Sequence, residues 1–401
     1  MKTDMNNKSV YLKISTVLFS ENSRDERELL AAEKAGWGNI HVIAPKGQKS
    51  LYPFYGKRCY TEIDLRPFGS GKLFKPIGKI VALCRYMKVA RRAQADIISG
   101  HDLLGLLIAY LSTIGLKRQP KLIYDAHEYE MGRFTNNKRR KLKSKLIFFT
   151  EKHLLKRAVL TITVNQSIYE QMKADYNLDF PAVIIRNVPI LRTPEKKRSA
   201  EIRKVWKNKM GLNENDKIYI YHGMIGPGRG IEEAIEAVSS TGYGGLVIMG
   251  YCTDNRYKLK LKSQITKSKD PSKIMIHESV TGSELVTYLG AADIGVVLIR
   301  PIARSYFFAL PNKLFESLHA GNPVIASDLP EIKRVVQSYD VGVVCDSGDM
   351  NDIKEKWIFL SKQNLFGAYH DKVEFARQRL NWQAESQILV KKLEAILGEK
   401  C

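Results

Sequence analysis

Residues 311–328 read PNKLFESLHAGNPVIASD, and this stretch decides the fold class. Its middle part, residues 313–320, has the apolar spacing of a helix. Gly321 and Pro323 end that helix just before the β-branched run at 323–328. A helix that leads directly into a buried strand is the repeating unit of parallel sheets. The stretch therefore predicts an α/β fold.

The same alternation of helices and strands runs through the whole chain. Strands are predicted at 11–19, 39–45, 95–100, 121–127, 160–165 and 182–187, and again at 217–223, 245–250, 273–278, 294–299, 323–328 and 342–346. A chain of 401 residues exceeds the roughly 250–300 at which a single core stops growing. We therefore expect two Rossmann-like, doubly wound domains facing each other across a cleft.

The polar, charged stretch at 192–216 contains few strand formers and is expected to separate the domains. The predicted division is 1–195, 196–375 and a C-terminal segment, 376–401. That segment contains a helix with an apolar side formed by Trp382, Ile388, Leu389, Leu393 and Ile396.

The net charge of +22 is concentrated in the first half, where residues 1–190 hold 33 Lys and Arg against 17 Asp and Glu. Cations alternate with apolar residues in segments 72–92 and 138–157. Basic amphipathic helices suit an anionic membrane surface or a phosphate-bearing substrate, and the alternative is a solvated helix face. No nucleic-acid-binding motif is recognisable, so no nucleic-acid partner is expected. Nothing in the sequence specifies an oligomeric state.

The cysteines indicate a reducing cytoplasm. They are odd in number, scattered and without CxxC spacing, which argues against disulfides and structural zinc: Cys59, Cys84, Cys252, Cys345 and Cys401. The first twenty residues favour a strand over a signal peptide, and no apolar run reaches the ~18 residues of a membrane-spanning helix. A cytoplasmic protein, peripheral at the membrane at most, is expected.

Ligands of doubly wound sheets bind at the carboxyl ends of the strands, so the loops there should carry the chemistry. YHGMIGPGRGI, residues 221–231, follows a strand and opens a helix. Its glycines allow the backbone to approach an anion, and Arg229 can contact phosphate in a bidentate manner. It is neither a GxGxxG fingerprint nor a P-loop, and a simple glycine-rich turn is the alternative.

Two further segments end strands or begin helices with polar groups. In YDAHEYE, residues 124–130, His127 can bond a hydroxyl or a phosphate, although a lone His is often structural. Only Asp125 accompanies it locally, which makes a poor metal site. In PNKLFE, Lys313 can neutralise phosphate, and Glu316 can accept hydrogen bonds from vicinal hydroxyls.

Taken together, these motifs resemble the retaining GT-B glycosyltransferases of family 4. The resemblance rests on PNKLFESLHAGNPVIASDLPEI, YHGMIGPGRGIEEAIEA and YDAHE. It extends to the segments at 20–44, 98–109, 184–189 and 291–299 and to LNWQAES at 380–386. The match covers nearly the whole chain in the family's order.

The resemblance implies that the second domain holds a nucleotide-sugar donor, that the first holds the acceptor, and that the last helix crosses back to the first domain. It implies no metal and no cofactor besides the donor substrate. Catalytic roles fall to His127, which contacts the transferred sugar, and to Arg229 and Lys313, which neutralise the donor diphosphate. Within the family pattern, Glu316 binds the ribose hydroxyls of the donor. The donor-binding residues that the resemblance implies are Gly223, Gly228, Arg229, Val280, Pro311, Asn312, Lys313 and Glu316.

Two positions depart from the family pattern. Phe308 stands where the first Glu of the E-x7-E motif is expected, and Met224 stands where an Arg often follows the first glycine. Both replacements remove contacts to the donor, and backbone N–H groups at 309–312 with Lys313 are expected to substitute. They leave open a non-catalytic subunit that partners another glycosyltransferase.

The expected reaction is transfer of a hexose or N-acetylhexosamine, with retention, from a nucleoside diphosphate sugar, most naturally a UDP-sugar. The expected acceptor is a glycan or a polyprenyl-diphosphate-linked oligosaccharide in surface polysaccharide synthesis. No carboxylate is evident as a covalent nucleophile, which permits front-face attack. A nucleotide-sugar 2-epimerase is a further alternative, whereas a nicotinamide enzyme would need a dinucleotide fingerprint that the sequence lacks.

Overall fold

The computed structural model describes residues 9–17, 24–47, 58–65, 75–133 and 138–398. Contacts within the chain divide it into two compact units. Unit 1 comprises residues 1–186 and 385–401, and unit 2 comprises residues 187–384.

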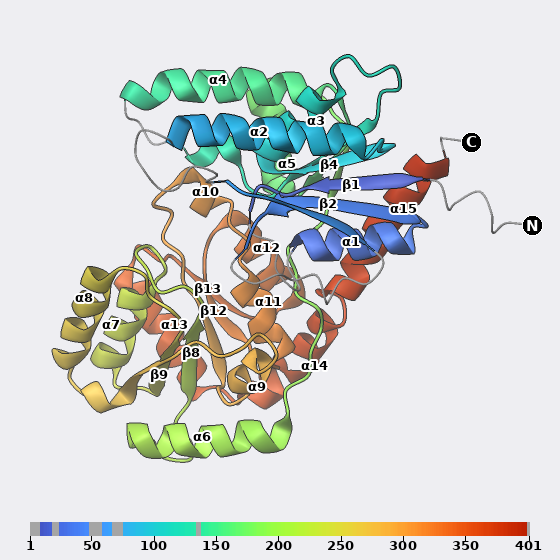
Figure 1. Ribbon diagram of the computed structural model, residues 1–401. Helices are drawn as coiled ribbons and strands as arrows, with labels where there is room; N and C mark the ends of the chain where they lie inside the picture. Colours follow the sequence, from blue (N-terminus) through green and yellow to red (C-terminus); the bar gives the residue numbers. More distant parts are fainter. Residues whose placement is uncertain (1–8, 18–23, 48–57, 66–74, 134–137, 399–401) are drawn as a thin grey trace, which may run out of the picture. The chain divides into compact units, whose positions relative to one another are not determined.

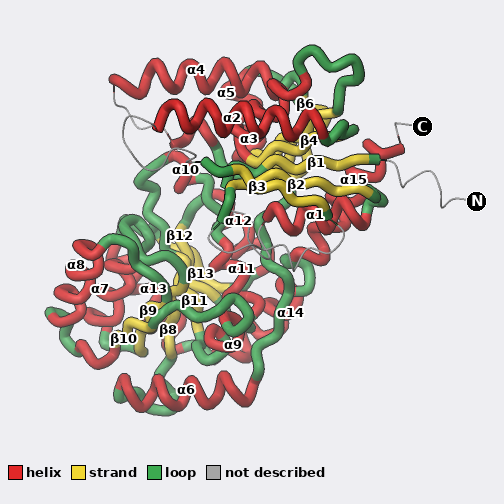
Figure 2. The backbone as a smooth tube through the Cα atoms, in the orientation of Figure 1, coloured by secondary structure: helices red, strands yellow, loops and turns green. Residues whose placement is uncertain are grey.

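Unit 1 is built on a parallel sheet of seven strands in the order β3-β2-β1-β4-β5-β6-β7 (Figures 1 and 2). Its strands are β1 (Val10–Ile14), β2 (Asn39–Pro45), β3 (Cys59–Ile63), β4 (Ile97–His101), β5 (Lys121–Ala126), β6 (Ala158–Thr163) and β7 (Ala182–Ile184). Its helices are α1 (Arg24–Lys34), α2 (Lys75–Arg92), α3 (Asp102–Thr113), α4 (Lys138–Leu155), α5 (Gln166–Tyr176) and most of α15 (Trp382–Gly398).

Unit 2 contains a second parallel sheet, of six strands in the order β10-β9-β8-β11-β12-β13. The strands are β8 (Ile218–His222), β9 (Gly245–Met249), β10 (Ile274–His277), β11 (Ile294–Val297), β12 (Val324–Ser327) and β13 (Gly342–Cys345). The helices are α6 (Lys196–Met210), α7 (Ile231–Thr241), α8 (Asn255–Thr266), α9 (Leu285–Leu289), α10 (Arg304–Phe307), α11 (Asn312–His319), α12 (Pro330–Tyr339), α13 (Met350–Lys362) and α14 (Leu365–Arg377). Both sheets are thus of the predicted doubly wound, Rossmann-like kind.

The strand predictions succeed at all twelve positions but miss β3. Its sequence, CYTEI, is mostly polar and half-exposed, because β3 is the edge strand of the first sheet. The predicted first strand was too long: β1 ends at Ile14, and the end of the 11–19 prediction lies outside the described residues.

The segment that follows unit 1, residues 187–195, belongs to unit 2 and is hydrogen-bonded to it. Pro189 accepts a hydrogen bond from the backbone of Trp382, and Leu191 donates one to the side chain of Gln383. Glu195 bonds Thr287 through its backbone N–H. The sequence-based boundary between residues 195 and 196 therefore falls inside unit 2 rather than at its edge.

Helix α15 begins in unit 2 and continues in unit 1 from Glu385 onward. Four of its five predicted core residues are buried, but Ile388 is 46% exposed, so that assignment was wrong. The buried side also contains Glu385 and Ser386, which lie one turn from Leu389 on the same face. The buried face therefore runs through Glu385, Ser386 and Leu389 and leaves Ile388 outside it.

Within unit 1, the Glu385 carboxylate accepts hydrogen bonds from the Arg186 backbone N–H at 3.0 Å and from its Nε at 2.6 Å. Glu385 is buried, and Arg186 is the last residue of the first segment of unit 1. This pair joins the point where the chain leaves unit 1 to the point where it returns.

Candidate functional site

The end of β8 and the first turns of α11 meet in unit 2. Lys313 Nζ lies 3.6 Å from the centroid of the Tyr221 ring, and Glu316 Oε2 lies 2.9 Å from His222 Nε2. Tyr221 and His222 are consecutive strand residues that point to opposite faces, whereas Lys313 and Glu316 share one helix face. The two contacts therefore hold the start of α11 at the carboxyl end of β8.

Lys313 is only 6% exposed, and its Nζ has no hydrogen-bond partner among the described residues. Burial, aided by the positive charge of Arg229, lowers the pKa of Lys313 well below its ordinary value, against the opposing charge of Glu316. A buried amine without a partner has unused donors for an anionic ligand.

Glu316 is the acidic group of this site. Burial alone would raise its pKa, but the hydrogen bond and charge of His222, together with the charges of Lys313 and His319, outweigh burial and lower it. The side chain remains 21% exposed. Glu316 is therefore an ionised acceptor that a ligand hydroxyl can reach.

The glycine-rich loop after β8 has the backbone that an anion site needs. Gly223, Gly228 and Gly230 all have positive φ, and a Cβ on Gly223 would meet nothing within 4 Å. Arg229 has its guanidinium 5.7 Å from the ring centroid of Tyr306, and its buried Nε lacks a partner in the described part of the chain. Arg229 thus retains hydrogen-bonding capacity.

The helix that follows this loop is less favourable to an anion than its position suggests. The first turn of α7 contains Glu232 and Glu233. Glu233 is paired with Arg300 at 2.7 Å, and Glu232 accepts a hydrogen bond from Tyr257. Anion binding here would depend on Arg229, Lys313 and backbone N–H groups more than on the helix dipole.

The other sequence-predicted donor residues lie at the edges of this region or apart from it. Pro311 is the N-cap of α11, and Asn312 is its exposed first residue. Val280 follows β10 and packs, partly buried, against the core cluster that contains β8 residues Ile218 and Ile220.

The two departures from the family pattern have defined structural roles. Phe308 is 8% exposed, with its ring edge-on to Phe307 at 5.2 Å between centroids, so an apolar aromatic group replaces a carboxylate. Met224 is partly exposed, and its carbonyl accepts the Tyr221 hydroxyl at 2.5 Å. Neither side chain offers the charge that the family pattern has there.

In unit 1, the carboxyl ends of β1, β4 and β5 enclose a buried ion cluster, defined here as Lys13, Arg24, Asp25, Glu28, His101 and Asp125. Lys13 Nζ lies 2.5 Å from Glu28, 3.2 Å from Asp25 and 3.5 Å from Asp125. Arg24 Nε binds Asp125 at 2.8 Å. Three acids and their basic partners thus neutralise one another inside unit 1.

His127 adjoins this cluster one residue beyond β5. Its ring centroid is 5.3 Å from that of His101, and its buried Nδ1 has no partner within the described chain. Burial and the charges of Arg24 and His101 lower the pKa of His127 to about 4, while the acids Asp125 and Glu128 oppose this shift. His127 is therefore neutral at physiological pH.

His101 has the opposite character. Burial disfavours its charged form, but hydrogen bonds and charges of Asp125 and Asp25 prevail and raise the pKa of His101 to about 10. Its Nδ1 lies 2.8 Å from Asp25 Oδ1. The two neighbouring histidines are thus an imidazolium, His101, and a neutral imidazole, His127.

The sequence offered only Asp125 beside His127, a poor metal site, and the structure groups Asp125 with Asp25 and His101. Ligand atoms of these three residues lie within 4.8 Å of one another. The Lys13 ammonium and the Arg24 guanidinium supply the positive charge there. No local sequence pattern predicts this cluster, because Lys13 and Asp125 lie inside strands and α1 supplies their partners from another segment.

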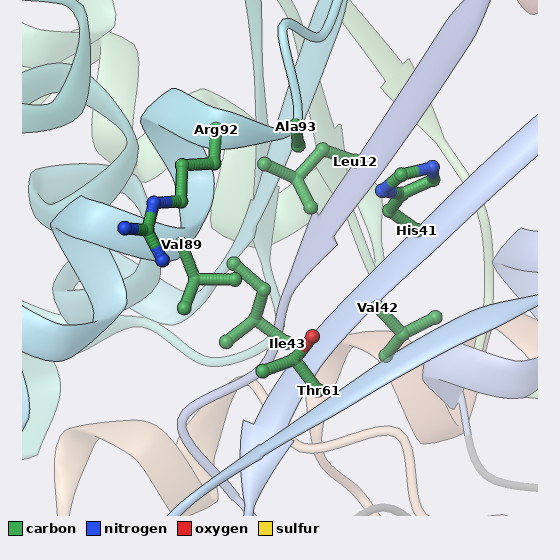
Figure 3. A pocket seen from close by; sticks show the side chains of 8 residues that line it. All are labelled: Leu12, His41, Val42, Ile43, Thr61, Val89, Arg92 and Ala93. Carbon is green, nitrogen blue, oxygen red and sulfur yellow. The ribbon is translucent and has the colours of Figure 1, made fainter.

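A cavity of about 200 Å³ lies in unit 1 between the middle of β1–β3 and the last turn of α2 (Figure 3). It is lined by Leu12, His41, Val42, Ile43, Thr61, Val89, Arg92 and Ala93. Figure 3 shows Arg92 and His41 at opposite sides of this group. Ligand pockets are typically about 300–1,000 Å³, so this cavity is too small for a nucleotide sugar.

The two basic segments of the sequence form α2 and α4, and α3 contacts both. The apolar residues of α4 are spread around the helix, so the expected amphipathic character is wrong for α4. On α4, Leu146 and Phe149 are 67% and 65% exposed, beside exposed Lys143 and Lys145. On α2, Ile77 and Ile80 are also exposed. The side chains of 138–142 and the start of the 72–92 segment lie outside the described residues. Within the described chain, no helix combines the length and apolar character needed to span a bilayer.

Two family models match successive parts of the chain. Residues 30–188 match "Glycosyltransferase Family 4", and residues 202–379 match "Glycosyl transferases group 1". The first match lies in unit 1 except for its last two residues, and the second lies in unit 2. No curated protein matches the chain in sequence.

Solved structures with the same fold are numerous and distant in sequence. A sucrose-phosphate synthase from Thermosynechococcus elongatus aligns over 98% of this chain and 100% of its own, with 15% identity and a TM-score of 0.72. HepE from Anabaena, solved in complex with UDP and glucose, aligns over 96% and 100%, with 14% identity and a TM-score of 0.73. WaaG, a glycosyltransferase involved in lipopolysaccharide biosynthesis, aligns over 97% and 100%, with 14% identity and a TM-score of 0.60. The likeness covers both units.

Proposed function

Because the chain consists of a family 4 and a group 1 glycosyltransferase domain in the GT-B fold, we propose that it transfers a hexose or N-acetylhexosamine from a UDP-sugar with retention of configuration. The observation that carries this proposal is the pair of contacts at the start of α11. Lys313 presents an unpartnered amine and Glu316 an ionised carboxylate, side by side. These are the groups that a diphosphate and a ribose require.

In the proposed mechanism, Arg229 and Lys313 stabilise the charge that develops on the leaving diphosphate. Glu316 accepts hydrogen bonds from the ribose hydroxyls and thereby orients the donor. His127, neutral because its pKa is low, bonds a hydroxyl of the transferred sugar. The donor phosphate takes the acceptor proton in a front-face attack, so the protein needs no covalent nucleophile and no metal.

The choice of UDP is supported by HepE, which was solved with UDP and with UDP-glucose. The proposed acceptor is a glycan or a polyprenyl-diphosphate-linked oligosaccharide of surface polysaccharide synthesis. WaaG, which acts in lipopolysaccharide biosynthesis, and the basic surface of unit 1 support this choice.

Calorimetric titration with UDP, GDP and ADP tests the donor site. We expect UDP to bind, and Glu316→Ala to weaken binding by about 100-fold, because hydrogen bonds to a charged group are worth about 1.5–3 kcal/mol each. Replacing the exposed residue Glu278 by Ala tests whether the uracil base of UDP binds near Val280. If it does, this variant should also bind UDP more weakly than the wild type. Absence of binding by all three nucleotides would favour the non-catalytic partner subunit.

Incubating the protein with a UDP-sugar that it binds and with a lipid extract distinguishes a transferase from an epimerase. A transferase releases UDP and forms a product whose anomeric configuration NMR reports as retained. An epimerase instead interconverts the nucleotide sugar without releasing UDP. An inverted product would contradict the proposed mechanism.

We also propose that α2 and α4 bring the protein to an anionic membrane surface where the acceptor resides. Exposed Leu146 and Phe149 among lysines fit such a surface. Replacing Lys143, Lys145, Lys156 and Arg157 by Gln should reduce sedimentation with anionic liposomes. The matched control replaces Lys196, Lys197, Lys204 and Lys209 on α6 and should sediment like the wild type.

A further inference from the structure

His222 occupies a position where the strand pattern calls for an apolar residue. Ile218 and Ile220, on the same side of β8, are fully buried in a core cluster, and His222 is itself only 3% exposed. An imidazole at a buried strand position is unfavourable unless its nitrogens are hydrogen-bonded. The residue therefore calls for an explanation other than packing.

Among the residues that the structure describes, the ring of His222 makes one hydrogen bond, which is to Glu316. Because an ionised carboxylate only accepts, Nε2 carries the hydrogen and donates over 2.9 Å to Glu316 Oε2. The other nitrogen, Nδ1, is buried and has no partner among the residues described. In the described part of the chain, the side-chain hydrogen bonding of His222 is thus directed to Glu316.

Both the backbone and the carboxylate of Glu316 are fixed by the protein. Its backbone is fixed by α11, whose Leu314, Phe315 and Leu318 are fully buried in the core. Its carboxylate is fixed by His222 through one oxygen, while the side chain stays 21% exposed. One oxygen is therefore committed within the protein, and no other side-chain hydrogen bond of Glu316 occurs in the described chain.

We propose that His222 is a positioning residue that orients the Glu316 carboxylate toward the ribose hydroxyls of a bound nucleoside diphosphate. This inference rests on the proposed function. Without His222, the Glu316 side chain would sample several rotamers and would have to be ordered by the ligand, which weakens binding. His222 need not touch the nucleotide itself.

The test compares nucleotides with and without ribose hydroxyls. Calorimetry gives the Kd of UDP, GDP and ADP and of their 2′,3′-dideoxy counterparts for the wild type, His222→Phe and His222→Gln. For the nucleotide that binds, we expect the wild type to prefer the ribose form by about tenfold or more. In His222→Phe this preference should fall to about one, with the dideoxy affinity changed by less than about twofold. The Gln variant, which keeps an N–H donor, should retain much of the preference.

A purely structural role predicts a different result. If His222→Phe weakens ribose and dideoxy nucleotides equally, or leaves the preference intact, the proposal is wrong. If a nucleotide binds but the wild type shows no preference, the ribose role of Glu316 and this inference fail while the nucleotide site stands. If no nucleotide binds, both the proposed function and this inference fail. His370→Phe, an exposed histidine of α14, is the control, and melting temperatures show whether each variant is folded.

Discussion

At the scale of single residues, Lys313 combines burial with an unpartnered amine. The contact with the Tyr221 ring, worth about 2 kcal/mol for a desolvated ammonium, offsets only part of that unfavourable burial. We expect Lys313→Met to raise the free energy of unfolding by about 1 kcal/mol near neutral pH and to weaken UDP binding by about 30-fold. Urea unfolding and calorimetry measure the two effects, and Lys258→Met on the exposed face of α8 should change neither.

The same variant makes a prediction about pH. The folded state lowers the pKa of Lys313 below its ordinary value of 10.5, so the unfolded chain binds this proton more tightly. Lys313 therefore destabilises the fold increasingly as the pH falls from 10.5 toward the lowered pKa. The gain in stability from Lys313→Met should be larger near about pH 6 than near about pH 10. An equal gain at both pH values would show that the fold does not lower the pKa of Lys313.

His101 should give the opposite pH dependence. Its pKa is raised to about 10 from an ordinary 6.5, so its stabilising effect is complete below 6.5 and is lost as the pH rises through 10. We expect His101→Gln to lower the free energy of unfolding near neutral pH by about 3 kcal/mol, because buried carboxylates lose a charged partner. The loss should shrink toward pH 10.

The His101 substitution also tests why His127 is neutral. Removing the neighbouring positive charge should raise the pKa of His127 from about 4, which NMR titration of the imidazole protons would record. His370→Gln is the exposed control for both measurements. An unchanged His127 pKa would leave burial and Arg24 as sufficient causes.

At the scale of elements, the glycine loop between β8 and α7 contains one glycine that close packing requires and one that borders open space. A Cβ on Gly230 would lie 2.4 Å from the Leu298 carbonyl oxygen, whereas one on Gly223 would meet nothing within 4 Å. Both have positive φ, which disfavours Ala by about 1–2 kcal/mol.

Gly230→Ala should therefore be the more destabilising substitution, by about 3 kcal/mol or more, and should weaken UDP binding only through misfolding. Gly223→Ala should reduce stability by about 1 kcal/mol but interfere with the approach of the diphosphate. Thermal unfolding and UDP titration of the two variants measure the contrast. Equal effects of both on folding would contradict it.

The elements also explain what the sequence could predict. Helix α11 and the strands around it were predictable because apolar periodicity and β-branched runs agree with the glycine and proline positions. The edge strand β3 was missed because a half-exposed strand lacks an apolar run. His222 was missed because one histidine at the end of a strand has no local pattern, and its partner Glu316 is 94 residues away. The ion cluster of unit 1 was missed for the same reason.

At the scale of the whole molecule, the Arg186–Glu385 pair should stabilise the path by which the chain leaves unit 1 and returns. Glu385 is 2% exposed and Arg186 has 29% of its side chain exposed. We expect Glu385→Ala to reduce stability by about 3 kcal/mol and to speed hydrogen exchange along α15. Exposed Glu394→Ala on the same helix is the control. Protection of α15 that is unchanged in Glu385→Ala would contradict the prediction.

The same pair has a consequence for how the chain could be divided. Unit 1 is discontinuous in sequence, so unit 2 is topologically an insertion within it, and expression of residues 1–186 alone would omit the buried Leu389, Leu393 and Ile396. Because Arg186 and Glu385 are hydrogen-bonded, a short linker could connect them directly in a protein from which residues 187–384 are deleted. The spliced protein would be a minimal unit 1 scaffold into which the second unit of a structural relative could be grafted.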